Sequence, residues 1–204
     1  MRTRDTIINH MLTTMGEGGV STLNSLHPSV STAKGILESE DLDLQSRGWW
    51  FNKELSLKLT QDNEGRVAVP QTALAIFVKG IENKTSVEKS RYVKRGGYIY
   101  DVYLHTNVIN TPVYVDVTLQ LAIEDMPDVA SSYLMHKAAE AMYVADDGDQ
   151  FKTEKLERRT MEAWQRFKAQ ELQVLSVNAH DNQFAQGLLG RAGANYGLPG
   201  GGTR

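Results

Sequence analysis

The chain has 204 residues, of which 41% are hydrophobic and 23% charged, a balance typical of a protein with a buried core. Its formal net charge of -3 excludes a global basic field that would draw it onto nucleic acid, and the absence of cysteine excludes disulfides, thiolate metal sites and cysteine nucleophiles. No apolar run approaches the roughly 20 residues of a membrane span and no targeting signal is recognisable, so we expect a soluble protein made inside the cell.

Two helices are predicted at the N-terminal end. The apolar residues of the first helix recur at helical spacing and stop at Gly16: Ile7, Ile8, Met11, Leu12 and Met15. Pro28 suits the first turn of the second helix, whose apolar face would carry Ala33, Ile36, Leu37 and Leu44. Its acidic residues are expected on a solvated face, because catalytic carboxylate pairs need burial to separate their pKa values: Glu38, Glu40, Asp41 and Asp43.

The hydrophobic period then changes from 3.6 to 2, which predicts an antiparallel sheet with one wet face. The first strand would begin at Phe51 and turn Leu55, Leu57 and Leu59 to one side. "RVAVP" (66–70) and "ALAIFVK" (73–79) are two further predicted strands. "RYVKRGGYIYDVYL" (91–104) predicts a hairpin that turns at Gly96 and Gly97, where a positive φ costs glycine little. The last strand, "PVYVDVTLQLAI" (112–123), would bury every second residue from Val113 to Ile123.

Two more helices and a glycine-rich segment complete the chain. A stripe of mostly small residues predicts close helix packing in the third helix: Ala130, Leu134, Ala138, Ala141 and Ala145. The fourth helix has a seam with spacings of 3 and 4: Leu156, Thr160, Ala163, Phe167, Gln170 and Val174. We therefore predict an α+β fold, in which an antiparallel bundle (1–48 and 124–178) carries an inserted antiparallel β-sheet domain (49–123) and an extended C-terminal arm (179–204).

"RGWWF" lies where the helical period ends and the strand period begins. Gly48 permits a sharp change of direction, and Trp49, Trp50 and Phe51 can anchor the sheet on the bundle. Arg47 is a candidate to hydrogen-bond a carbonyl or carboxylate at that corner. We favour this structural anchor over stacking on a sugar or a base.

No constellation of catalytic or metal-binding residues is recognisable. None of the five histidines has a partner at metal-ligand spacing, and no phosphate-binding, dinucleotide or nucleophile-elbow motif occurs. We expect no cofactor, no metal and no catalytic residue.

Two segments are candidates for partner contacts. Basic and aromatic residues alternate in the hairpin, with Lys89, Arg91, Lys94 and Arg95 among Tyr92, Tyr98 and Tyr100. This patch suits a DNA-binding module over 89–100 or a contact with an acidic partner, although a solvated hairpin face is favoured. The glycine-rich tail from 187 carries spaced apolar residues that can bind a partner surface: Leu188, Leu189, Tyr196 and Leu198. We expect the tail to be mobile in the free chain and to order on assembly, the alternative being a disordered remnant.

Three separated motifs resemble the tail tubular protein A family of T7-like podoviruses: "GEGGVSTL" (16–23), "LQSRGWWFN" (44–52) and "YVKRGGYIYD" (92–101). The resemblance covers roughly residues 1–145 and departs at Gly18 and Gly19, where relatives tend to carry proline. It implies a virion structural protein that is assembled in the host cytoplasm. It further implies a head-to-tail adaptor ring, twelvefold in the family, between the portal protein and the tail nozzle (tubular protein B).

Viral DNA would pass through such a ring without sequence-specific binding and without any membrane. The C-terminal arm would then contact an adjacent subunit or the portal. Two alternatives remain open: a tail-associated glycan hydrolase with two acidic residues as acid and base, and the DNA-binding module.

Overall fold

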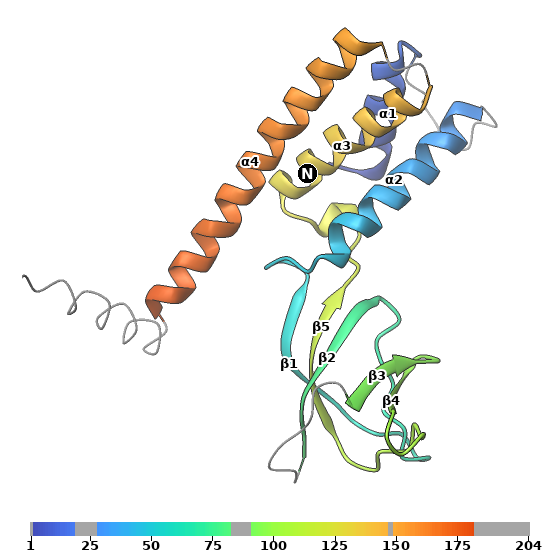
Figure 1. Ribbon diagram of the computed structural model, residues 1–204, viewed down its shortest axis with the longest axis vertical. Coiled ribbons are helices and arrows are strands. Elements are labelled where there is room, and N and C mark those ends of the chain that lie inside the picture. The colour runs from blue at the N-terminus through green and yellow to red at the C-terminus, as the bar shows by residue number, and fades with distance from the viewer. Residues whose placement is uncertain (1, 19–27, 83–90, 147–148, 182–204) are drawn as a thin grey trace, which may run out of the picture.

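The computed structural model describes residues 2–18, 28–82, 91–146 and 149–181. In these ranges the chain forms four α-helices and antiparallel β-sheets, which confirms the predicted α+β class. The helices gather at one end of an elongated molecule and the strands at the other (Figure 1). None of the described helices is both long enough and apolar enough to cross a membrane.

The helical part consists of α1 (Arg4–Met15), α2 (Pro28–Ser46), α3 (Asp128–Asp146) and α4 (Gln150–Asp181). The hydroxyl of Thr3 caps α1 by accepting the N–H of Thr6, and Gly16 ends the helix at φ +88°. The helix α3 contacts the other three helices, so it lies at the centre of the group. The four helices share one hydrophobic core, which includes Ile7, Ile8, Met11, Leu37, Leu134 and Phe167.

The predicted helix faces need two corrections. In α3, Ala141 is only partly buried and Ala145 is exposed, whereas Ala139, Met142 and Tyr143 are buried. This is the consequence of its central position, because helices cover α3 on more than one side. In α4 the first four seam residues are buried, as predicted, but Gln170 and Val174 are partly exposed. The C-terminal end of α4 runs past the other helices, and the helix continues beyond the predicted boundary at 178 to Asp181 (Figure 1).

The sheet part contains a three-stranded sheet in the order β1-β5-β2 and a two-stranded hairpin β3-β4, and all pairs are antiparallel. Its strands are β1 (Lys53–Leu59), β2 (Ala73–Ile81), β3 (Tyr92–Arg95), β4 (Tyr98–Asp101) and β5 (Val113–Leu119). The central strand β5 buries Val113, Val115 and Val117, the alternation that its sequence predicts. These valines belong to a second hydrophobic core, separate from that of the helices.

Three strand predictions are wrong in detail. The strand β1 begins at Lys53 and not at Phe51, and a bulge at Ser56 (φ +56°) shifts its register between Glu54 and Leu57. Because one extra residue moves the side chains to the other face, Leu55 is 68% exposed. Residues 66–70 form isolated bridges to three different segments and no continuous strand. The last strand ends at Leu119, and Ile123 starts a short 3-10 turn that packs on the helical core, η2 (Ile123–Asp125).

Candidate functional site

The chain leaves the helices for the sheet at a tight corner after α2. Gly48 has a φ of +70°, and a Cβ at this position would meet the Cε of Lys53 at 2.5 Å and the Oγ1 of Thr118 at 3.0 Å. The positive φ therefore favours glycine, while the end of the Lys53 side chain could move aside for a Cβ. The neighbouring Arg47 donates a hydrogen bond to the carboxylate of Asp43 one turn earlier, at 2.8 Å.

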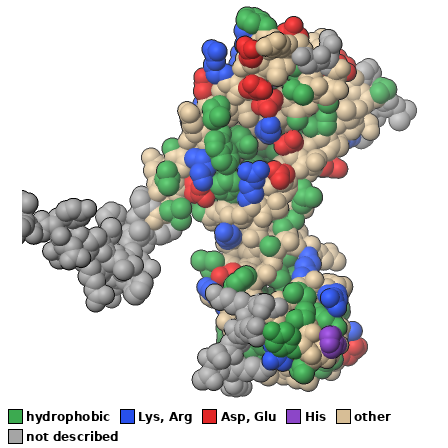
Figure 2. Space-filling model, in the orientation of Figure 1, with side chains coloured by type: hydrophobic (Ala, Val, Ile, Leu, Met, Phe, Trp, Pro, Cys, Tyr) green, Lys and Arg blue, Asp and Glu red, His purple; other side chains and the backbone are tan. Residues whose placement is uncertain are grey.

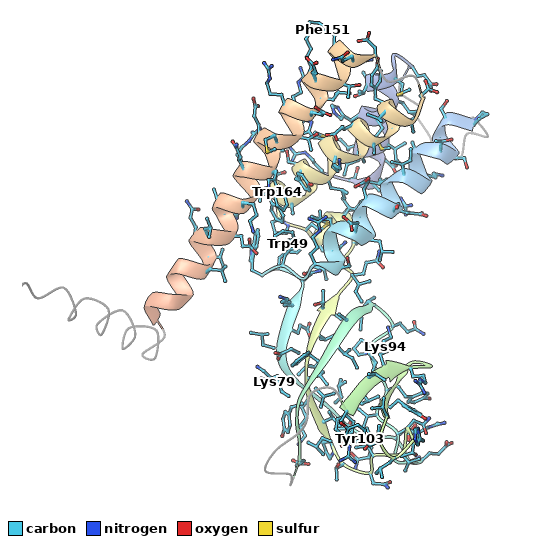
Figure 3. The ribbon with its side chains drawn as sticks, in the orientation of Figure 1. Trp49, Lys79, Lys94, Tyr103, Phe151 and Trp164 are labelled. Carbon is cyan, nitrogen blue, oxygen red and sulfur yellow. The ribbon has the colours of Figure 1, made fainter. Side chains whose placement is uncertain are left out.

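The aromatic residues of the corner pack on the helical core. Trp49, which is 5% exposed, lies 4.5 Å from the ring of Phe167 in α4, measured between ring centroids. Trp50 and Phe51 lie 5.3 Å and 6.3 Å from the same ring. Tyr133 and Trp164 complete an aromatic cluster around Phe167, and Figure 3 shows Trp164 on α4 close to Trp49. The cluster joins the start of β1 to the C-terminal half of the bundle.

Two buried amides that no sequence motif had marked hold the same corner. Asn52 accepts the N–H of Trp49 at 2.7 Å and donates to the carbonyls of Gln45 and Leu119 at 2.9 Å. The side chain of Gln45 accepts the N–H of Leu121 at 2.7 Å and donates to its carbonyl at 2.9 Å. The sequence contained one sign that Gln45 is buried, since this residue lies next to Leu44 on the apolar face of α2.

The prediction that the acidic residues of α2 lie on a solvated face is wrong for Asp41. It is only 8% exposed, and Gln45 donates a hydrogen bond to its carboxylate at 2.8 Å. Burial raises the pKa of Asp41, although the hydrogen bonds from Gln45 and Gln120 act in the opposite direction. It lines a depression of about 340 Å³, which also contains Glu124. The backbone N–H of Arg4 binds Glu124 and lowers the pKa of that carboxyl.

Internal contacts hold most of the basic hairpin patch. Gly96 and Gly97 form its turn, at φ values of +58° and +80°. The guanidinium of Arg91 pairs with the carboxylate of Asp101 at 2.7 Å, and Lys94 donates to the carbonyl of Ala73 at 2.6 Å. Arg95 stacks on the ring of Tyr100, with its Cζ 4.2 Å from the ring centroid. Lys89 lies outside the described residues, as do the tail residues Leu188, Leu189, Tyr196 and Leu198.

Large apolar side chains are exposed at separate places on the molecule. Leu55 and Phe77 lie on the open face of the three-stranded sheet, where they line a groove of about 370 Å³. On α4, four apolar side chains are more than half exposed: Phe151, Met161, Leu172 and Leu175. At the far end of the sheet part, Tyr103 and Leu104 are exposed by 56% and 66%. Figure 2 shows hydrophobic side chains at the surface of both the helical part and the sheet part.

Two grooves run along α4. The first, which we call the cationic groove, lies between α1 and α4, has a volume of about 360 Å³, and is lined by His10, Lys152, Lys155 and Arg159 among others. The second, which we call the α3–α4 groove, has a volume of about 390 Å³ and is lined by Glu140, Glu157, Lys137, Arg47 and Trp164 among others.

Two histidines lie beside the cationic groove. The rings of His10 and His136 meet edge to face, with their centroids 5.6 Å apart. Burial lowers the pKa of both rings, and the positive charge of Arg159 lowers it further. Within the described ranges no three histidine, aspartate or glutamate side chains gather as a metal site would require.

Comparison with known proteins identifies the family. A model of the family described as "Tail tubular protein" matches residues 6–187, which include all four helices from their first turns and every strand. Tail tubular protein A of Klebsiella phage KP34 is 30% identical over 141 residues, covering 69% of this chain and 72% of that protein. The chain therefore belongs to the tail tubular protein family, a family of structural proteins of phage tails.

Proposed function

We propose that this chain is the subunit of a head-to-tail adaptor ring that joins the portal protein to the tail nozzle (tubular protein B). One observation carries the proposal: the family match extends over both the helical part and the sheet part. The ring and its twelvefold symmetry come from the resemblance of the three sequence motifs. The chain would act in the virion, at the junction of head and tail, after assembly in the host cytoplasm.

The distribution of exposed apolar residues supports a role between several neighbours. Monomeric proteins rarely expose contiguous apolar patches, and such patches mark interfaces. Here Leu55 and Phe77 line one groove on the sheet, while Leu172 and Leu175 lie about one turn apart on α4 of the helical part. A subunit with ring neighbours and axial partners needs contact surfaces on both parts.

The charge of the chain supports unhindered DNA passage. A strongly basic lumen would retain a polyanion, whereas this chain has a net charge of -3. The hairpin cations Arg91 and Lys94 are already bound to Asp101 and to the carbonyl of Ala73. We therefore prefer the adaptor to the DNA-binding module over 89–100, and we assign Lys94 and Arg95 to the rim of a protein contact.

We also propose the division into a bundle domain (1–48 and 124–178), a sheet domain (49–123) and a C-terminal arm (179–204). The two separate hydrophobic cores support it. The corner from Arg47 to Phe51, with the ring of Phe167, then fixes one domain on the other. The apolar residues of the arm would bind an adjacent subunit or the portal.

No catalytic role is part of this proposal. A glycan hydrolase would most readily use Asp41 and Glu124, because their pKa values shift in opposite directions beside one depression. However, Gln45 already binds the carboxylate of Asp41, and Arg4 binds that of Glu124. Glycan cleavage by the purified chain that Asp41→Asn abolishes would establish the hydrolase instead.

Negative-stain imaging of the purified chain with its portal protein tests the adaptor function. We expect rings seated on the portal, and a chain that neither forms rings nor binds the portal would contradict the proposal. A second sample, truncated after residue 186, tests the arm. We expect it to give incomplete or less stable rings, whereas fully occupied rings of equal stability would show that the arm has no role in assembly.

A further inference from the structure

The cationic groove lacks a counter-charge of its own. The described residues that line it include His10, Lys152, Lys155 and Arg159, but no carboxylate. The side chain of Arg159 makes no ion pair and no hydrogen bond within the described part of the chain, and it is exposed. The positive charge comes from Lys152, Lys155 and Arg159, whereas burial and the charge of Arg159 lower the pKa of His10 and His136 and so disfavour their charged forms. The groove is therefore suited to a partner that brings carboxylates.

Carboxylates gather on the opposite side of α4. The α3–α4 groove contains Glu140 and Glu157, and Glu40 and Asp43 of α2 adjoin it. Burial raises the pKa of Glu40, and the negative charges of Asp43 and Glu140 add to that effect. Lys137 pairs with Glu140 and Arg47 with Asp43, so that Glu40 and Glu157 leave this surface, which we call the acidic face, with an excess of negative charge. Glu157 makes no ion pair among the described residues.

The two surfaces point away from each other. At about 100° per residue, Arg159 and Glu157 lie roughly 160° apart around the axis of α4. One copy of the chain cannot bring them together, but a second copy can. A contact between two different surfaces of identical subunits is heterologous, and it repeats into a closed ring when the rotation closes.

We propose that the cationic groove of one subunit binds the acidic face of the next, with Arg159 and Lys155 opposite Glu157 and its neighbours. This interface rests on the proposed ring and specifies which faces of the subunit meet in it. A contact of this polarity gives each ring one direction, since every subunit offers its α1 side to the α2 side of its neighbour. It also neutralises the cationic groove, which would otherwise attract the phosphates of passing DNA.

Charge reversal with matched controls tests the interface. Arg159→Glu is compared with Arg158→Glu, which makes the same charge change on the adjacent, outward position of α4. Glu157→Arg is compared with Glu154→Arg, also outward. All four positions are exposed, so circular dichroism should show folded proteins. Assembly is measured by analytical ultracentrifugation and by negative-stain imaging on the portal protein.

Each interface variant alone should raise the concentration at half-assembly by at least about tenfold, because like charges then meet at every contact of the ring. The two outward controls should assemble like the parent. An equimolar mixture of Arg159→Glu and Glu157→Arg should regain assembly, with the two variants alternating, since each reversed surface then meets a complementary one. High ionic strength should weaken assembly of the parent chain.

The outcomes separate the two proposals. If the parent chain forms rings and both interface variants also do so at the parent concentration, the adaptor function stands and this interface is wrong. If the variants lose assembly and the mixture does not recover it, the pairing of these two faces is likewise wrong. If Arg159→Glu leaves the rings intact but weakens binding of a duplex DNA probe, the groove binds nucleic acid instead. A parent chain without rings on its portal overturns both proposals.

Discussion

The side chain of Asn52 donates a hydrogen bond to the backbone carbonyl of Gln45 at 2.9 Å, while the side chain of Gln45 binds both backbone groups of Leu121. The two residues thus connect the end of α2, the entry to β1 and the exit from β5. Both are almost completely buried, with exposures of 2% and 0%. The passage between helices and sheet is fixed by paired polar groups as well as by aromatic packing.

Asn52→Ala should lower the free energy of unfolding by about 1–3 kcal/mol, because it leaves the buried N–H of Trp49 without its acceptor. Chemical denaturation monitored by tryptophan fluorescence measures the change. Asn63→Ala, in an exposed turn, is the control and should have almost no effect. Equal stability of the Asn52 variant and the control would show that the junction does not depend on this network.

Phe167→Ala should destabilise the fold by about 3–5 kcal/mol, since it removes a fully buried ring that contacts Trp49, Trp50 and Phe51. Trp49→Ala should fall in the same range. Phe151→Ala removes the same side chain from the same helix at a position that is 66% exposed, and it should change stability little. A Trp49 variant that melts like the parent but loses binding to a sugar or a nucleic acid would contradict the structural role.

The stability of the helical part should fall as the pH drops below about 6.5, the ordinary pKa of histidine. Burial, Arg159 and Arg2 lower the pKa of both His10 and His136 in the folded chain, and Arg166 lowers the pKa of His136 further. The unfolded chain then takes up protons first, so that this stabilisation is present above pH 6.5 and is lost as the pH falls through the lowered values.

Thermal melts of His10→Gln and His136→Gln between pH 7.5 and pH 5 should therefore show a weaker pH dependence than the parent. His105→Asn, at an exposed position with a φ of +53°, is the control and should keep the parental slope. Glu40 and Asp41, whose pKa values burial raises, act in the opposite direction in all these proteins, so the comparison uses differences between variants. Identical slopes for all three variants would refute the prediction.

Asp41→Asn should raise the melting temperature at pH 7, because the buried carboxylate is less favourable when ionised in the folded chain than in the unfolded one. The advantage should shrink as the pH falls, since protonation then removes the charge from the parent as well. An asparagine oxygen can still accept the hydrogen bond from Gln45. Asp43→Asn, at an exposed position, should give no comparable gain, and a lower melting temperature for Asp41→Asn would show that the charge itself is needed.

Arg95→Ala should leave the affinity for duplex DNA unchanged at physiological salt, because the hairpin cations mainly serve the sheet part. Lys94→Ala should lower the thermal stability of the sheet part, because the hydrogen bond to the carbonyl of Ala73 is lost. Fluorescence anisotropy with a labelled duplex checks the first statement, and thermal melts check the second. Specific DNA binding by the parent that both substitutions weaken would favour the DNA-binding module.

The α+β class, the number and order of the helices and the family were predictable from the sequence, because they depend on local hydrophobic period and on separated motifs. Helix ends such as Gly16 and the first turn at Pro28 follow from backbone preferences that act over a few residues. The central strand β5 was predictable for the same reason, since its valines alternate without interruption.

The positions of Leu55, Asp41 and the grooves depend on contacts between distant segments, which a sequence pattern does not show. The bulge at Ser56 depends on its pairing with β5, where the carboxylate of Asp116 binds the N–H of Ser56, and this turned Leu55 outward. The neighbours of Asp41 include Gln120, which is 79 positions away in the sequence and donates to its carboxylate at 3.5 Å, so the pattern of α2 alone does not predict that Asp41 is buried. The cations of the cationic groove belong to α4 itself, whereas the acidic face also needs Glu140 of α3 and Glu40 and Asp43 of α2, and only the packing of the helices brings these carboxylates beside α4.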